Sequence, residues 1–141
     1  MKNRFVEKPD ENFIMEMRGF FCLHDAVVAI DSTDVKECLE GASNVIILSG
    51  NASGYNRCAD AIEDAVLHAN KCDHDLFSAG SVILYVVCPK NEPMLMSENE
   101  AINAFMQLFR PGTQWKWGLA EKSDIDEMSI LLIASNLKSK Q

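Results

Sequence analysis

The chain has 141 residues, which fits one domain, and 48% of them are hydrophobic, enough for one buried core. Its net charge of −8 argues against partners of the same sign, namely nucleic acid and anionic membrane surfaces. No apolar run approaches the roughly 20 residues that cross a bilayer, and no secretory signal follows the charged start, so we expect a cytoplasmic protein.

The first thirty residues give the weakest structural signals. Residues 1–11 are polar and charged, and we expect them to form a mobile tail. Residues 13–30 contain three short apolar runs that periodicity alone cannot assign. We favour strands for 20–23 and for 26–30.

In the middle of the chain, capping residues and turns mark the ends of the helices and strands clearly. Residues 31–34 offer several N-caps, and apolar positions then follow at helical spacing from 35 to 42, ending near Gly41. Residues 45–48 are apolar on both faces, as in an interior strand, and 51–54 form a turn. A second helix follows with a buried stripe from 58 to 72, and its charged residues are expected to face solvent: Arg57, Asp60, Glu63 and Asp64.

The last sixty residues predict a buried strand, a helix, a strand with one solvent-exposed face and a final core strand. Residues 82–88 form a buried strand, and Ser97 with Glu100 has the form of a capping box for the next helix. That helix is expected to bury four side chains: Ile102, Phe105, Leu108 and Phe109. Two tryptophans, Trp115 and Trp117, alternate with polar residues, 124–127 is a loop, and 130–133 is the last core strand.

This order predicts an α+β, two-layer α/β domain with a mixed four-stranded sheet and helices packed on it. Because only a short loop separates the last two strands, we expect them to pair antiparallel. The predicted single domain covers residues 12–136, and 137–141 form a C-terminal tail.

Three clusters are better explained by structure than by chemistry. Residues 50–54 lie between a strand and a helix, but their spacing matches no phosphate-binding loop, so we interpret them as a turn. His68, Cys72 and His74 lack the spacing of a zinc site, and we expect no metal. The pair at 24–25 most simply makes a turn. The five cysteines are odd in number, without a Cys-x-x-Cys pair, and read as free thiols.

Asp31 and Asp34 have two readings. They can cap a helix and place negative charge on its first turn. They can also form a pair of carboxylates at a loop tip, able to polarise a water molecule in the site of another protein.

From residue 30 to about 134 the chain resembles the C-terminal domain of FtsZ, the bacterial tubulin-like division protein. The stretch 30–36, IDSTDVK, is similar to the family's synergy loop and the helix after it. The stretch 50–62, GNASGYNRCADAI, resembles the family's Ala-Ser-Gly, Asn-Arg and alanine-rich helix. Residues 117–118, 126–127 and 130–135 resemble its last two strands.

The resemblance implies a role in assembly. In that family an N-terminal domain binds GTP, and the C-terminal domain of one subunit pushes its synergy loop into the nucleotide site of the next. The two acids of that loop correspond to Asp31 and Asp34, and Ala29 stands where the family has asparagine. The phosphate-binding loop is absent from this sequence, so we expect no nucleotide cofactor and no GTP hydrolysis by this chain unaided. The start at Met1 favours a stand-alone protein.

We therefore expect a non-catalytic module for filament regulation that docks on an FtsZ-like subunit or on itself. Its contact candidates are Ser32, Asn51, Trp115 and Trp117, beside the two acids. The alternative is a small-molecule-binding or enzymatic oligomeric domain that reuses the fold, with Trp115, Trp117, His24 and His68 as candidates. A third reading is self-association through residues 13–23.

Overall fold

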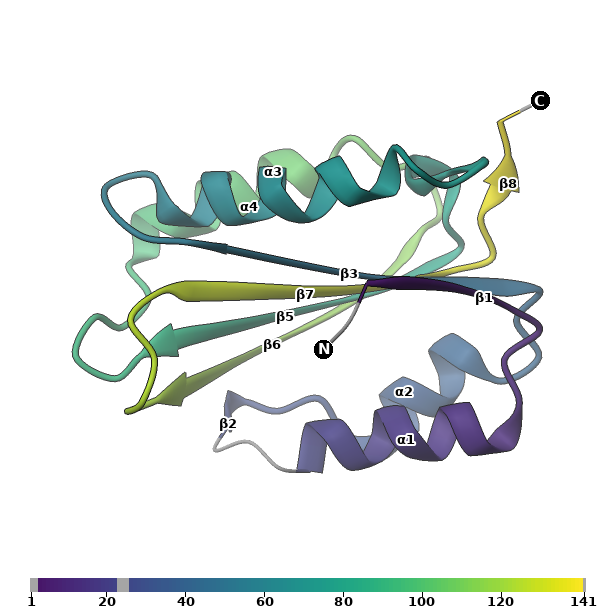
Figure 1. The fold of residues 1–141 in the computed structure, drawn as a ribbon, viewed down its shortest axis with the longest axis horizontal. Helices are drawn as coiled ribbons and strands as arrows, with labels where there is room; N and C mark the ends of the chain where they lie inside the picture. The colour runs from purple at the N-terminus through teal and green to yellow at the C-terminus, as the bar shows by residue number, and fades with distance from the viewer. Residues whose placement is uncertain (1–2, 23–25, 141) are drawn as a thin grey trace.

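The computed structural model describes residues 3–22 and 26–140, which form one six-stranded sheet with two helices on each face (Figure 1). The strand order is β1-β3-β7-β5-β6-β2, and a separate two-stranded sheet pairs β4 with β8. The bounds in sheet order are β1 Arg4–Glu7, β3 Asn44–Ala52, β7 Met128–Ser135, β5 Ser81–Pro89, β6 Gln114–Lys122 and β2 Ala26–Val28. In the described part of the chain, no helix has the length and apolar character needed to cross a membrane.

The predicted fold class is confirmed, because β5 and β6 pair in parallel and all other neighbours in the large sheet are antiparallel. The number of strands is six instead of four. β1 and β2 are short edge strands that the sequence pattern did not separate from their surroundings.

The helices divide the core into two layers. α3 (Arg57–Ala69) and α4 (Asn99–Met106) lie on one face of the sheet, and α1 (Glu11–Cys22) and α2 (Ser32–Leu39) lie on the other (Figure 1). The alanine stripe of α3 lets it approach the sheet closely, so Gly50 of β3 has no space for a side chain. A Cβ at that position would lie 2.1 Å from the carbonyl oxygen of Ala61.

The antiparallel pairing predicted for the last two strands is wrong. β6 and β7 are not neighbours, because β5 lies between them and pairs with both. β7 is buried along almost its whole length and gains neighbours on both edges, β3 and β5. The half-exposed β6 takes a place nearer the edge, where one wet face costs less.

The N-terminal prediction needs two corrections. Residues 4–7 are the edge strand β1 rather than part of a mobile tail, and 20–22 belong to α1 rather than to a strand. The helix wins because its buried residues Phe13, Ile14, Met17 and Phe21 fall on one helical stripe. The predicted strand at 26–30 is shorter, β2, and residues 23–25 lie outside the described part of the chain.

Two details of the helix before β6 also differ. A 3₁₀ turn, η2 (Met96–Glu98), precedes α4, and Glu98 rather than Glu100 accepts from a backbone amide, that of Leu95, at 2.8 Å. Leu108 is exposed rather than buried, because α4 ends at Met106 and the following turn leaves the helical stripe.

The expected C-terminal tail is attached to the domain. Leu137 is buried, and the side chain of Asn44 donates to its carbonyl at 3.0 Å and accepts from its amide at 2.8 Å. β8 (Lys138–Ser139) then pairs with β4 (His74–Asp75).

Side chains cover the part of β3 that extends beyond β1. The amide of Ser49 donates to the side chain of Asn3 at 2.6 Å, and the amide of Asn51 donates to Asp64 at 3.0 Å. Both outward-facing amides are therefore satisfied without a seventh strand.

Candidate functional site

The first turn of α2 holds the two acids that the sequence singled out. Asp31 is the N-cap, and its side chain accepts from the amide of Asp34 at 2.9 Å. Asp34 reaches back to the amide of Asp31 at 3.3 Å, which completes a reciprocal capping box. The capping prediction is confirmed, and the local geometry follows from the sequence Asp-x-x-Asp before an apolar stripe.

Asp34 has a second partner. Its carboxylate lies 3.4 Å from the ammonium of Lys116 on β6, which ties the start of α2 to the N-terminal part of that strand. Asp31 is exposed, and Ser32 beside it is half-buried. Asp31 can therefore meet a partner while its helix stays capped, whereas Asp34 is held by the fold.

Apolar side chains lie along the sheet edge just before the acids. All three residues of β2 are exposed, with Val27 at 59%. Val28 pairs with Leu119 on β6. Trp117, which is 40% exposed, lies two residues from Leu119 on the α3 and α4 face of the sheet, whereas Lys116, the partner of Asp34, points to the α2 face. We call Val27, Val28, Asp31 and Ser32 together the acidic-loop surface.

The other predicted contact residues are more deeply committed to the fold. Trp115 is half-buried and packs edge-to-face on Phe105 and Phe109, with ring centroids 6.2 and 4.8 Å away. Asn51 accepts from the hydroxyl of Ser129 and lines a cavity of about 360 Å³ on the α1 side of the sheet. The tryptophans therefore divide between core and surface.

The turn at residues 50–54 and His74 have structural roles in the fold. Gly54 has a φ of 95°, the left-handed conformation that suits glycine in a turn. The ring of His74 packs on Phe5, with centroids 4.7 Å apart. Within residues 3–22 and 26–140, no group of three His, Cys, Asp or Glu side chains is arranged to hold a metal ion.

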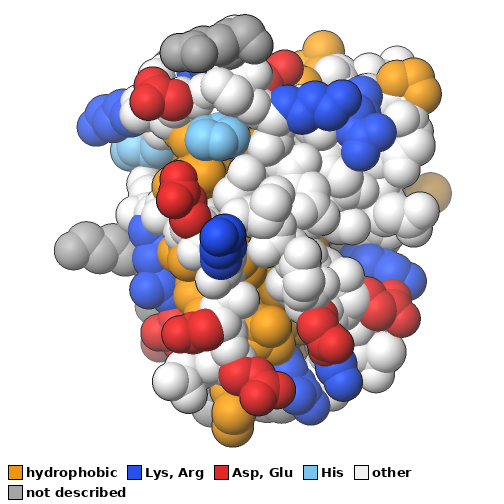
Figure 2. Space-filling model, turned by 90° about the vertical axis from the view of Figure 1, so that its right-hand side faces the viewer, with side chains coloured by type: hydrophobic (Ala, Val, Ile, Leu, Met, Phe, Trp, Pro, Cys, Tyr) orange, Lys and Arg blue, Asp and Glu red, His pale blue; other side chains and the backbone are white. Residues whose placement is uncertain are grey.

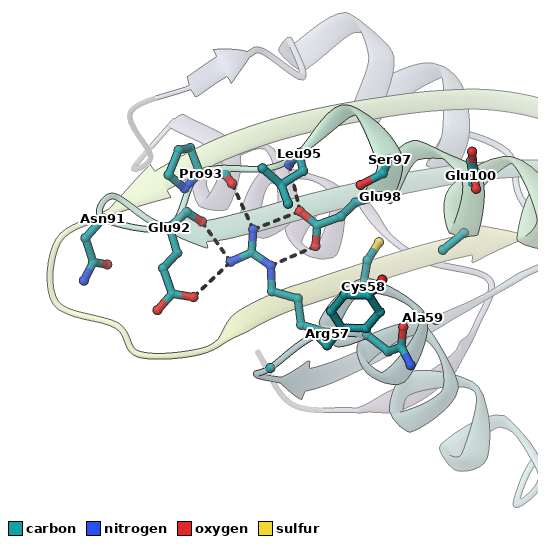
Figure 3. A pocket seen from close by; sticks show the side chains of 14 residues that line it. Arg57, Cys58, Ala59, Asn91, Glu92, Pro93, Leu95, Ser97, Glu98 and Glu100 are labelled. Carbon is teal, nitrogen blue, oxygen red and sulfur yellow. Dashed lines mark hydrogen bonds and ion pairs between the residues drawn. The ribbon is translucent and has the colours of Figure 1, made fainter.

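The structure also contains a groove that the sequence did not predict. It has a volume of about 670 Å³ and lies at the C-terminal ends of β3 and β5, between the starts of α3 and of η2 (Figure 3). Arg57, expected to face solvent, is buried beneath it with a side chain 7% exposed. Its nearest charged partner is Glu98, which is 9% exposed.

Arg57 holds the walls of this groove together. Its guanidinium donates to both carboxylate oxygens of Glu98 at 2.8 and 2.9 Å, and to the carbonyls of Glu92 and Pro93 at 2.8 and 3.0 Å (Figure 3). The hydrogen bonds from Arg57 lower the pKa of Glu98, and those to Glu98 raise the pKa of Arg57. In the sequence, the burial of Arg57 is indicated only by its position at the start of an otherwise apolar helical stripe.

The mixed sheet with two helices on each face defines the fold of an FtsZ/tubulin-like C-terminal domain. Comparisons with known proteins agree with this fold class. No protein-family profile matches the chain. Cell division protein FtsZ of Porphyromonas gingivalis is 24% identical over 138 residues, which cover 96% of this chain and 30% of that protein.

Solved structures show the same fold. A structure of an empty FtsZ dimer from M. jannaschii matches with a TM-score of 0.68 and 20% identity, over 83% of this chain and 37% of that one. GDP-form protofilaments of TubZ from Bacillus thuringiensis serovar israelensis match with a TM-score of 0.65 and 12% identity, over 82% and 30%. The resemblance to the FtsZ/tubulin fold is thus confirmed, and the chain spans about a third of the length of these proteins.

Proposed function

We propose that this chain is an assembly module of the FtsZ/tubulin type, which docks on an FtsZ-like subunit, or on a second copy, through the acidic-loop surface. The observation that carries the proposal is the exposed carboxylate of Asp31 at a capped helix start, beside the apolar edge strand β2. The likeness to an FtsZ dimer and to TubZ protofilaments supports assembly as the use of this fold.

The docking would be non-catalytic on this chain's side. Asp31 offers a carboxylate at the tip of a rigid helix start, so it could orient a water molecule only in a site that the partner provides. The exposed Val27 and Val28 supply apolar area just before it in the chain, and burial of such area drives most protein association. A chain that occupies one face of a subunit in this way regulates the length of a filament.

The test is the GTP turnover and polymer length of an intact FtsZ, titrated with this chain. Asp31→Asn with Asp34→Asn is the informative variant, because asparagine caps a helix as well as aspartate but carries no charge. Asp60→Asn, which removes an exposed acid from the first turn of α3, is the matched control. We expect the wild type and the control to change turnover or length.

The variants then separate two mechanisms. Loss of the effect in the Asp31 and Asp34 variant assigns it to the carboxylates. Retention of the effect there, with loss in Val27→Asp, assigns it to apolar docking. If the wild type changes neither quantity and does not co-sediment with the polymer, the proposal is wrong.

A second candidate function is small-molecule binding. The cavity of about 360 Å³ that Asn51 lines falls within the usual range of ligand sites, roughly 300–1,000 Å³. A thermal-shift screen with common metabolites tests it. Stabilisation that Asn51→Ala abolishes would favour this function over docking.

A further inference from the structure

The groove above Arg57 has features of a protein-binding surface. Exposed large apolar side chains stand at its edge: Tyr55 and Leu95 line it, and Met96, 88% exposed, lies between two lining residues. A single exposed apolar residue needs no explanation, but three around one concave site indicate a contact surface.

The groove is also acidic. Glu92 and Glu100 line it and are exposed, while the charge of Glu98 is balanced by Arg57 (Figure 3). Arg57 also lies 3.8 Å from the carboxylate of Glu92 and offsets part of its charge, so Glu100 is the exposed carboxylate of the groove that Arg57 does not pair with. The groove therefore fits a partner that combines positive charge with an apolar side chain.

The opposite end of the same molecule has that combination. Arg110 donates to the carbonyl of Ser78 at 2.9 Å, and the amide of Lys138 donates to the hydroxyl of the same serine at 2.7 Å, so the two basic residues lie side by side. Lys140 is exposed two residues further on, and Leu108, 61% exposed, precedes Arg110. Two exposed acids lie beside the lysines, since Asp75 pairs with Lys138 and the carbonyl of Asp73 accepts from the amide of Lys140, so basic side chains exceed acidic ones here by three to two. We call Leu108, Arg110, Lys138 and Lys140 the basic end.

Figure 2 shows this end of the molecule, where Lys and Arg side chains lie in both halves and two histidines lie in the upper half together with several acidic side chains. Acidic side chains are more frequent in the lower half, on the side of α1 and α2. The basic end lies on the layer of α3 and α4, as the groove does, because Arg110 follows α4 and β8 pairs with β4, which follows α3.

The groove and the basic end face in opposite directions. The groove follows the C-terminal ends of β3 and β5, whereas Arg110 and the η1 turn (Leu76–Ser78) precede the N-terminal ends of β5 and β6. The nine residues of β5 separate them by roughly 30 Å along the sheet. One copy cannot fill its own groove, but a copy displaced along the strands can.

We propose that the basic end of one copy docks in the acidic groove of a second copy, head to tail. Such a contact joins two different surfaces, so it leaves a groove and a basic end free at the ends of each complex and can repeat. Its charge pairs are at an exposed rim, so it weakens with salt over a Debye length of about 10 Å at 0.1 M. It involves no residue of the acidic-loop surface and does not rest on the docking proposed above.

The test uses the chain alone, by sedimentation velocity across a range of concentrations at low and at high salt. Two single variants reverse one charge each: Glu100→Lys in the groove and Lys138→Glu at the basic end. We expect the wild type to associate at low salt and each variant alone to stay monomeric. An equimolar mixture of the variants restores association, because the opposite charges then meet at both junctions.

Two further samples separate docking from general effects. Met96→Asp abolishes the association at both salt concentrations, because it places a charge in the apolar contact. Glu63→Lys, which reverses an exposed charge of α3 away from the groove, leaves association unchanged. A wild type that stays monomeric at all concentrations, or a mixture that behaves as its two components do, overturns the proposal, whatever the result with FtsZ.

Discussion

Replacing Arg57 with methionine tests whether the groove floor is a buried ion pair that holds the domain together. The substitution keeps an unbranched apolar stem but leaves the carboxylate of Glu98 buried without its cation, and frees the carbonyls of Glu92 and Pro93. Removing one partner of a buried pair costs about 3–5 kcal/mol. For a chain of this size that corresponds to a fall in Tm of roughly 6–20 °C.

The assay is urea and thermal unfolding followed by circular dichroism, with the two transitions checked for two-state behaviour. Arg57→Met combined with Glu98→Gln should regain part of the lost stability, because no charge is then buried and glutamine can still accept from Leu95. Lys36→Met, which breaks the exposed pair with Glu40, is the control and should cost about 0.5 kcal/mol or less. A loss below about 1 kcal/mol for Arg57→Met, the value of an exposed pair, would refute the reasoning.

Three further predictions concern other parts of the core. Because Arg57 lowers the pKa of Glu98 in the folded chain, this carboxylate stabilises the fold above its ordinary pKa of about 4.3, and the contribution disappears as the pH falls through the lowered value. Acid unfolding of Glu98→Gln should lack that part of the pH dependence. Gly50→Ala should cost more than the usual 1–3 kcal/mol of overpacking, or prevent folding, since its Cβ would meet the backbone of α3. Gly19→Ala in α1, with open space around it, should stabilise the fold by about 0.5–1 kcal/mol. Equal unfolding midpoints for the two variants would contradict the packing described for Gly50. Burial raises the pKa of Cys38, Cys58 and Cys88 to about 11, so at neutral pH a thiol reagent followed by peptide mapping should label Cys72 before any of these three.

Local signals in the sequence predicted local structure well. Asp31 and Asp34 define the start of α2 because a capping box needs only residues three apart, and the helix and strand cores from Val35 to Ile133 lie where periodicity placed them. The resemblance to FtsZ was predictable for the same reason, since it rests on short stretches in a fixed order.

Features that depend on distant residues were not predictable from these patterns. The position of β7 between β3 and β5 is decided by which strand gains most from two neighbours, and loop length says nothing about that. Arg57 looked exposed because a charged residue usually is, and its burial depends on partners far along the chain, Glu98 and the carbonyls of Glu92 and Pro93. Arg57 and Glu98 both line the groove, so the sequence patterns did not indicate it.

The covered edge of β3 has a consequence for the behaviour of the chain at high concentration. Unpaired strand edges are templates on which other chains add strands, and they lead to aggregates and amyloid. Asn3 and Asp64 occupy the amides of Ser49 and Asn51 that an incoming strand would need. Loss of these two side chains, as in Asn3→Ala with Asp64→Ala, would open this edge to incoming strands and should raise the rate of irreversible aggregation, measured by thioflavin T fluorescence at high protein concentration.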